Sequence, residues 1–178
     1  SWLEFGTLSG YVLGASVVAD PRAAGAGHQA DLGGQHGALP VRAGECAADQ
    51  FLVGPRRLGG VTGYWVVTPL DVTETGARLA VVRGFVTDTT NPIDPPSGVV
   101  SVDGTLAPGE SPAAPPAGLP AWPQQARGSI DFSLLVNEWP GELYNAFVFA
   151  QAEKTVAGVG IPAPDGVERV PPPEVTGG

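Results

Sequence analysis

GYWVVTPLDVTETGARLAVVRGFV, residues 63–86, holds two runs of β-branched and aromatic residues separated by the polar segment DVTETG. Such residues favour strands, and the polar residues between the runs favour a turn. The sequence therefore predicts strands at residues 64–70 and 78–87 that pair as an antiparallel hairpin. Near the end of the second run, Arg83 stands among apolar side chains.

Similar short runs recur on both sides of this hairpin. They lie at residues 50–53, 99–106 and 142–153, and turn-rich segments separate them. One short helix is predicted at residues 129–136, beginning near Ser129 or Asp131. With 26 glycines and 19 prolines, about a quarter of its 178 residues, the chain is unsuited to a helical fold. The prediction is a mainly β fold, an antiparallel small barrel or sandwich with one short helix.

The length of the chain fits one domain, and its composition divides it into three parts. Residues 1–19 are a candidate membrane anchor or a remnant of one, and residues 20–40 are an irregular segment rich in Gly and Ala. Residues 41–175 form the predicted β domain. Within it, residues 107–126 contain six prolines and predict an extended connector on the surface.

The anchor prediction depends on Trp2–Ala19, the most apolar stretch of the chain. This stretch contains Glu4, and its length is close to the minimum for crossing a bilayer core of about 30 Å. Its glycines recur at every fourth residue, a spacing that lets two membrane helices approach closely. A glycine-rich strand or loop pair would have the same composition. An N-terminal membrane helix and such a pair are therefore both open.

The formal net charge is −9 and the pI is near 4.5. Proteins that bind nucleic acid neutralise its phosphates with clustered Lys and Arg, so no nucleic-acid partner is expected. Lys154 and eight arginines are the only cationic side chains apart from histidine, which makes an arginine within a strand notable. The single cysteine, Cys46, excludes an internal disulfide.

Enzyme motifs are absent from the chain. It contains no G-x-S-x-G, no H-E-x-x-H and no phosphate-binding G-x-x-x-x-G-K, so no catalytic residue is predicted. Residues 25–30, GAGHQA, match the dinucleotide fingerprint G-x-G-x-x-A. No clear strand precedes them, and Gly33 and Gly34 interrupt the helix that should follow, so a loop is the better interpretation.

Four side chains with metal-ligand chemistry lie within one segment: His28, Asp31, His36 and Cys46. Their spacing matches no known ligand module, so no metal site is predicted. A metal-dependent enzyme built on these four residues is the remaining enzymatic hypothesis.

Arg83 poses a physical question. Alternate residues of a strand share a face, so Leu79, Val81, Arg83 and Phe85 should project together. A buried arginine needs a carboxylate partner or a bound anion, because an unpaired buried charge is costly. Three explanations are open: an internal ion pair, a bulge at Gly84 that turns Arg83 outward, or binding of an anion or partner.

The residues themselves point to a family. TGYWVVTPLDVTETGARLAVVRGFV resembles the signature of the surfeit locus cytochrome c oxidase assembly family, whose pattern G-x-Y/W-V-V-T-P-L/F leads through a turn into V-N-R-G-F/W. A Pro-Arg pair precedes this hairpin in the family, as Pro55 and Arg56 do here. Later segments, SVDGTLAPGESP, SIDFSLL, LYNAFV and VPPP, resemble the rest of the family pattern. The resemblance covers about residues 41–175 and is strongest over 55–87.

The chain departs from this pattern in three ways. Val82 stands where the family usually has asparagine, residues 20–40 have no recognisable counterpart, and the family's second membrane helix is not seen after PPPEVTGG. The resemblance implies structural roles for the motif residues Pro55, Gly63, Tyr64, Trp65, Pro69, Gly84 and Phe85. Arg56 and Arg83 are the candidate binding residues for an anion or a partner, since guanidinium groups bind carboxylates bidentately.

The resemblance also implies a function. It is that of a non-enzymatic accessory factor that helps to assemble cytochrome c oxidase by assisting haem a insertion into the catalytic subunit. Haem a would be held at most transiently, and the partners would be oxidase subunits and the membrane. The domain would face the periplasmic or intermembrane side of the cytoplasmic (inner) membrane. An alternative is a structural accessory subunit that stays bound to a respiratory oxidase.

Overall fold

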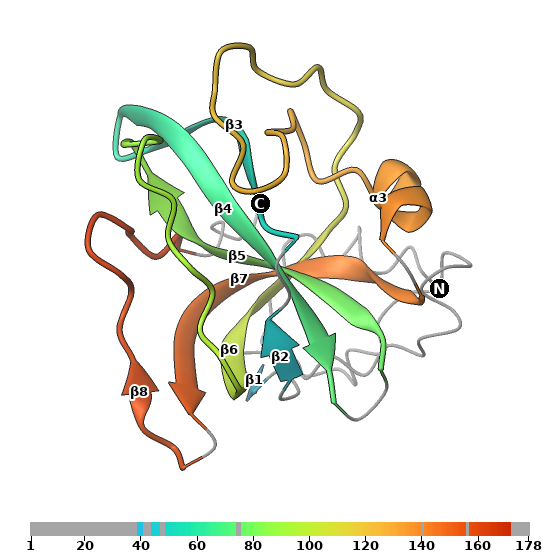
Figure 1. Ribbon diagram of the computed structural model, residues 1–178, viewed down its shortest axis with the longest axis vertical. Coiled ribbons are helices and arrows are strands. Elements are labelled where there is room, and N and C mark those ends of the chain that lie inside the picture. Colours follow the sequence, from blue (N-terminus) through green and yellow to red (C-terminus); the bar gives the residue numbers. More distant parts are fainter. Residues whose placement is uncertain are drawn as a thin grey trace, which may run out of the picture.

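The computed structural model describes residues 39–40, 44–46, 49–73, 76–139, 141–155 and 157–171 (Figure 1). The predicted anchor at residues 1–19 lies outside these residues, and so does nearly all of the Gly/Ala-rich segment.

The described part of the chain is mainly β with one short helix, as predicted. Every predicted strand is present, and so is the helix. The elements in chain order are β1 (Leu39–Pro40), β2 (Gly44–Cys46), β3 (Phe51–Leu58), β4 (Val61–Val72), β5 (Arg78–Val86), β6 (Val99–Pro108), α3 (Phe132–Glu138), β7 (Leu143–Thr155) and β8 (Gly160–Ile161).

Local hydrogen bonds cap both ends of the helix α3. Asp131 is its N-cap, and its side chain accepts a hydrogen bond from the backbone N–H of Ser133 at 2.9 Å. At the other end, the N–H of Trp139 donates to the carbonyl of Leu135 at 2.8 Å. Of the two N-caps considered from the sequence, Asp131 is the one used.

The predicted hairpin is formed by β4 and β5. These strands pair antiparallel from Tyr64 opposite Val86 to Asp71 opposite Arg78. The pairing of β5 with β7 is parallel, which departs from the predicted antiparallel sheet. The chain between these two strands runs through β6, the connector and α3, a connection long enough for a parallel crossover.

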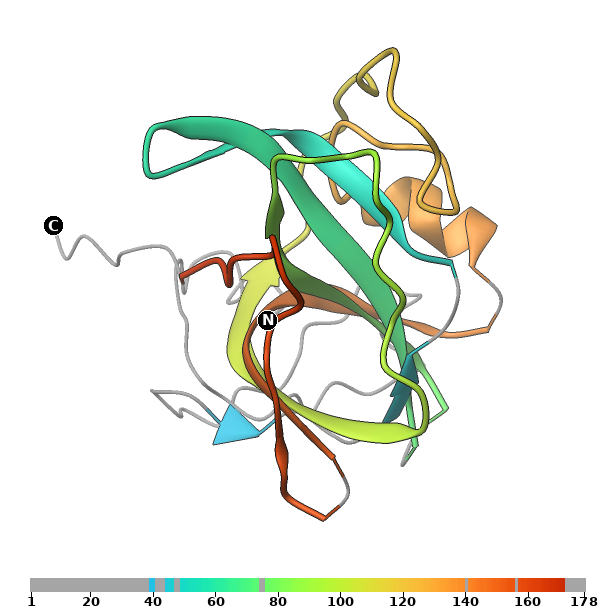
Figure 2. The ribbon, with the colours of Figure 1, turned by 60° about the vertical axis from the view of Figure 1, so that its left-hand side comes forward.

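All eight strands belong to one sheet, which curls because β7 pairs with both β5 and β6 and β2 links β6 to β4 (Figure 2). β2, β4, β5, β7 and β6 pair in a circle, but β1, β3 and β8 each pair with a single strand and leave open edges, so the sheet as a whole is not closed. Along the outer edge of β3, the partner is the end of the connector: Gly54 N–H donates to the Arg127 carbonyl at 3.0 Å, and Arg127 N–H donates to Leu52 at 2.8 Å. The prediction of a small barrel or sandwich is therefore met only in part, by a single curled and open sheet.

Three apolar clusters hold the sheet, and each has its own place in the fold. The first lies inside the curl and takes side chains from β4, β5, β6 and β7, with Cys46 of β2 packed against it. The second lies between the sheet and α3, and includes Leu135 and Trp139. The third lies under the connector, where the buried Trp122 donates its Nε1–H to the Thr89 carbonyl at 2.8 Å.

The connector follows β6 and lies over one end of the molecule together with α3, away from the hairpin of β7 and β8 (Figures 1 and 2). Its first two predicted residues, Ala107 and Pro108, still belong to β6. The rest is extended and is fixed through Trp122 and its pairing with β3.

Candidate functional site

Arg83 lies at a register shift in the hairpin. Val66 is opposite Gly84 and Val67 is opposite Val82, so Arg83 has no residue directly across from it on β4. As a result, Leu79 and Val81 pack in the first apolar cluster, whereas Phe85 packs in the second. The prediction that Phe85 shares the face of Leu79 and Val81 was wrong, because the shift reverses the alternation of faces.

Arg83 forms an internal ion pair with Glu153 of β7. Its Nε lies 2.8 Å from Glu153 Oε2, and its Nη2 lies 2.9 Å from Oε1, which is a bidentate arrangement. Both side chains are almost completely buried, with 2% and 1% exposed. Its remaining nitrogen, Nη1, is buried and has no hydrogen-bond partner among the described residues. Of the three explanations open from the sequence, the internal pair is the one the structure shows.

A third charged side chain completes this arrangement. Arg169 Nη2 lies 3.1 Å from Glu153 Oε1, and its Nη1 donates to the backbone carbonyl of Arg83 at 2.9 Å. We call Arg83, Glu153 and Arg169 the charged cluster. The sequence analysis missed Glu153 and Arg169, although Glu153 showed the same signal as Arg83, a charge within an apolar strand.

Arg83 and Glu153 keep their ionised states in spite of burial. Burial opposes the charge on Arg83, but hydrogen bonds and the charge of Glu153 outweigh this effect and raise the pKa of Arg83. Burial likewise opposes the charge of Glu153, but its bonds to Arg83, with a smaller contribution from Arg169, leave the pKa of Glu153 lowered. Burial raises the pKa of the nearby Cys46 thiol to about 11, so Cys46 stays neutral at physiological pH.

The charged cluster fastens the last described segment of the chain, residues 166–170, which we call the exit segment. Phe85 N–H donates to the Glu168 carbonyl at 2.7 Å, and Glu168 N–H donates back to Phe85 at 3.0 Å. Gln151 donates to the carbonyl of Val170 at 2.7 Å. Arg169 adds its own bonds from within the segment, so both backbone and side chains hold it against β5 and β7.

Gly84 makes this close packing possible. A Cβ at this position would lie 2.3 Å from Val167 Cγ1 and 2.9 Å from the Glu168 carbonyl oxygen, so any larger residue would push the exit segment away. Each residue of the Arg83-Gly84-Phe85 stretch thus has its own role. Arg83 forms the ion pair, Gly84 lets the exit segment approach β5, and Phe85 pairs with that segment through its backbone.

Arg56 lies in a different environment, on β3. Its guanidinium Cζ lies 4.5 Å from the centre of the Trp65 ring, and its Nη2 forms an ion pair with Glu110. The side chain is 22% exposed. Trp65 in turn contacts Phe149 edge to face, with ring centres 5.1 Å apart. The structure therefore keeps Arg56 apart from Arg83 and places it against the half-buried Trp65, which packs on the buried Phe149.

The other motif residues serve the backbone of the hairpin. Pro55 follows a cis peptide bond at the point where β3 shifts register, and Gly63 gives the Phe85 ring room, since a Cβ there would lie 2.5 Å from Phe85 Cζ. Tyr64 packs against the third apolar cluster. Pro69 lies where β4 passes from its pairing with β3 to its pairing with β2, a place where a strand tolerates a residue without an N–H.

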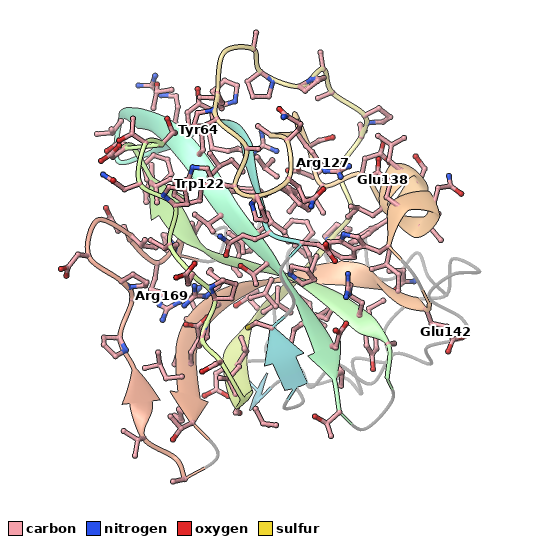
Figure 3. The ribbon with its side chains drawn as sticks, in the orientation of Figure 1. Tyr64, Trp122, Arg127, Glu138, Glu142 and Arg169 are labelled. Carbon is pink, nitrogen blue, oxygen red and sulfur yellow. The ribbon has the colours of Figure 1, made fainter. Side chains whose placement is uncertain are left out.

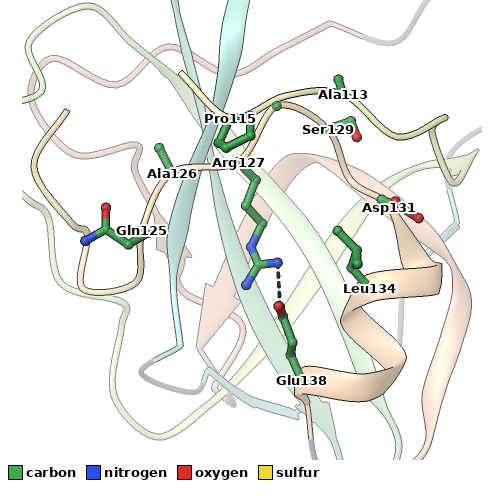
Figure 4. A pocket seen from close by; sticks show the side chains of 10 residues that line it. Ala113, Pro115, Gln125, Ala126, Arg127, Ser129, Asp131, Leu134 and Glu138 are labelled. Carbon is green, nitrogen blue, oxygen red and sulfur yellow. Dashed lines mark ion pairs between the residues drawn. The ribbon is translucent and has the colours of Figure 1, made fainter. Parts of the chain in front are cut away.

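Hollows at the surface of the described part of the chain include two that are lined by residues of interest. One, of about 240 Å³, lies between the connector and α3, and the ion pair of Arg127 with Glu138 crosses it (Figure 4). The other, of about 520 Å³, lies between the tip of the β3–β4 hairpin and the exit segment, with Phe85 and Val61 in its lining. Figure 3 shows Arg127 and Glu138 beside the connector and α3, whereas Arg169 lies on the side of β7 and β8.

Most of the candidate metal ligands fall outside the part of the chain that the structure describes. His28, Asp31 and His36 lie outside the described residues, as does the GAGHQA segment, and only Cys46 lies within them. Over the described ranges, no group of three or more His, Cys, Asp or Glu side chains is placed to hold a metal ion.

Comparison with known families identifies the class of protein. The chain matches the family model described as SURF1 family over residues 15–176, a range that includes the 20–40 segment. The chain therefore belongs to the SURF1 family, which confirms the resemblance found in the sequence. This family is associated with cytochrome c oxidase assembly.

Neither the curated proteins nor the solved structures include a significant match to this chain. Within the described residues, none of the helical structure is long and apolar enough to cross a membrane.

Proposed function

We propose that this protein assists the insertion of haem a into the catalytic subunit of cytochrome c oxidase and catalyses no reaction itself. The observation that carries the proposal is the family match over residues 15–176. The residues of the family signature support it, because they build a rigid hairpin that fixes the exit segment rather than a reactive centre.

The ionisable groups of the described residues favour binding over catalysis. Five of the arginines are paired with carboxylates: Arg56 with Glu110, Arg78 with Asp49 and Asp71, Arg83 and Arg169 with Glu153, and Arg127 with Glu138. Such pairs hold structure and orient surfaces, and they do not activate a nucleophile.

Haem a would be cargo for this protein. Both histidines lie outside the described residues, and Cys46, with its pKa raised to about 11, is a poor iron ligand at neutral pH. The described residues are better suited to the propionate groups of haem or to carboxylates of a partner. Arg56 is the candidate contact, because its side chain is partly exposed. The guanidinium group of Arg83 is buried and already paired with Glu153.

The proposal includes a location. The domain would lie on the periplasmic or intermembrane side of the cytoplasmic (inner) membrane, held there through the apolar stretch at residues 2–19, and its partners would be oxidase subunits.

The test is deletion of the gene in the native host, followed by spectroscopy of purified oxidase and extraction of total haem a. We expect haem a occupancy of the oxidase to fall while haem a itself is still made. Wild-type protein should restore occupancy, and Arg56→Ala should restore it poorly although it folds. Normal oxidase spectra in the deletion strain would refute the proposal. Stoichiometric co-purification with mature oxidase would instead favour a permanent subunit.

A further inference from the structure

Arg56, the proposed contact for a haem propionate, already holds a carboxylate of its own chain. Its Nη2 donates to Glu110 Oε1, and its Nη1 donates to the carbonyls of Pro55 at 3.3 Å and Gly128 at 3.4 Å. A guanidinium group can bind a carboxylate at two points, side-on through Nε and Nη2 or end-on through Nη1 and Nη2. Both arrangements use Nη2, so a carboxylate from outside must compete with Glu110.

The ion pair between Arg56 and Glu110 lies where such a competitor can reach it. The two side chains are 22% and 29% exposed. Partly exposed pairs contribute little to stability, because water and salt screen them, so this pair can be exchanged for another at small cost. The pair between Arg83 and Glu153, whose side chains are 2% and 1% exposed, is closed to any ligand.

Glu110 is held at Arg56 by bonds that do not involve Arg56. Its Oε1 also accepts a hydrogen bond from the N–H of Ile130 at 3.0 Å, and its own N–H donates to the carbonyl of Ile130 at 2.8 Å. These bonds join the start of the connector to the residue that precedes Asp131, the N-cap of α3. The backbone of the fold therefore positions this carboxylate beside the guanidinium group.

We propose that Glu110 is an internal competitor that occupies Arg56 until a ligand carboxylate takes its place. The charge of Glu110 also repels an incoming carboxylate, so it weakens the binding of the ligand in two ways. A weak hold suits a protein that passes its cargo on to another. This inference rests on the proposed function, because it concerns the way in which Arg56 holds a haem propionate.

The test compares the full wild-type chain with Glu110→Gln in fluorescence titrations of mesoporphyrin IX, a metal-free porphyrin with two propionates. The amide of Gln keeps an oxygen that can accept from Ile130, but it carries no charge. We expect Glu110→Gln to bind mesoporphyrin IX about fivefold or more tightly than wild type. The dimethyl ester of mesoporphyrin IX, which has no carboxylate, should bind both proteins equally. A purely structural role of Glu110 would give no gain in affinity.

Glu138→Gln is the matched control, because it removes the carboxylate partner of Arg127, another partly exposed arginine. It should change the affinity for mesoporphyrin IX by less than about twofold. In an Arg56→Ala background, Glu110→Gln should give no gain. Circular dichroism would establish that each variant is folded.

The outcomes separate this inference from the contact on which it rests. Equal affinity of wild type and Glu110→Gln, with weaker binding by Arg56→Ala, would overturn the competition by Glu110 and leave Arg56 as the contact. An equal gain in Glu138→Gln would likewise overturn it, since the effect would then be one of overall charge. Absence of binding, or binding that Arg56→Ala does not weaken, would overturn both the inference and the contact.

Discussion

Arg56 and Arg83 both belong to the family-like stretch of the sequence, yet the fold uses them in opposite ways. Arg83 is 2% exposed and pairs bidentately with a carboxylate that is equally buried. Arg56 is partly exposed, lies on the face of Trp65 and pairs with Glu110 at the surface. The buried ion pair of Arg83 therefore makes a rigid connection inside the fold. The partly exposed ion pair of Arg56 makes a contact that a ligand could share.

The carboxylate partners of the two arginines also differ in the parts of the fold that they connect. Glu153 is also bound by Arg169 of the exit segment, so the pair with Arg83 is one part of a three-residue arrangement that fixes the end of the domain. Glu110 lies at the start of the connector and also accepts a hydrogen bond from the backbone N–H of Ile130 at 3.0 Å. The charged cluster therefore connects the exit segment to β5 and β7, whereas Arg56 connects β3 to the connector.

The largest effect is expected for Arg83→Met. This change leaves Glu153 buried with only Arg169 as a charged partner, and breaking a buried pair from one side costs about 3 to 5 kcal/mol. The free energy of unfolding from urea titration at neutral pH measures this loss. The double variant Arg83→Met, Glu153→Leu should recover much of it, because no carboxylate then remains uncompensated. A double variant with a lower free energy of unfolding than Arg83→Met alone would contradict this explanation.

The second effect concerns pH. The pKa of Glu153 is lowered in the folded protein from its ordinary value of 4.5, so its ionised form stabilises the fold above that value. This stabilisation is lost as the pH falls through the lowered folded pKa. Glu153→Gln lacks the titration, so the stability difference between wild type and this variant should shrink as the pH falls below about 4.5. Urea titrations of both proteins from pH 7 to pH 3 measure it. Parallel curves would show that folding leaves the pKa of Glu153 unchanged.

A third, smaller effect is expected for Gly84→Ala. The new Cβ would meet Val167 Cγ1 and the Glu168 carbonyl, so the exit segment must shift, at a cost of about 1 to 3 kcal/mol. Hydrogen exchange should become faster at the amides of Phe85 and Glu168, which pair with each other.

Gly160→Ala is the matched control for this change, because a Cβ at Gly160 would meet no atom within 4 Å. It should leave both the unfolding free energy and the exchange of these two amides unchanged. If Gly84→Ala is as mild as the control, the exit segment is not held by its contact with β5.

Features of the fold that depend on neighbouring residues could be predicted from the sequence, whereas contacts between residues far apart in the chain could not. Alternating apolar residues and turn residues are local, so the strands, the short helix and its cap were predictable. The need of Arg83 for a partner was also predictable from burial alone. Its identity was not, because Glu153 is 70 residues away in sequence and reaches Arg83 only through the parallel pairing of β5 with β7.

Register shifts set a second limit on prediction. The interpretation of Phe85 as a neighbour of Leu79 and Val81 assumed an unbroken strand, and the shift at Arg83 reversed its face. The pairing along the edge of β3 was missed for a similar reason. Residues 124–127 were interpreted as part of the connector and its flank, yet their backbone pairs with β3. Arg56 was identified from the resemblance, but its contact with Trp65 depends on the pairing of β3 with β4.

The smallest effect on stability is expected for Arg56→Ala, and it separates the two arginines most clearly. Its ion pair is partly exposed, and such pairs contribute at most about 1 kcal/mol, to which the contact with Trp65 adds about 0.5 to 1 kcal/mol. The loss should shrink at high salt. Arg57→Ala removes the same charge from the next residue, which is exposed and, within the described ranges, donates hydrogen bonds to Gly60 and Thr62, so it should change stability by less than about 0.5 kcal/mol. An Arg56→Ala protein as unstable as Arg83→Met would show that both arginines are structural, whereas a stable protein that fails to restore oxidase would place the function at Arg56.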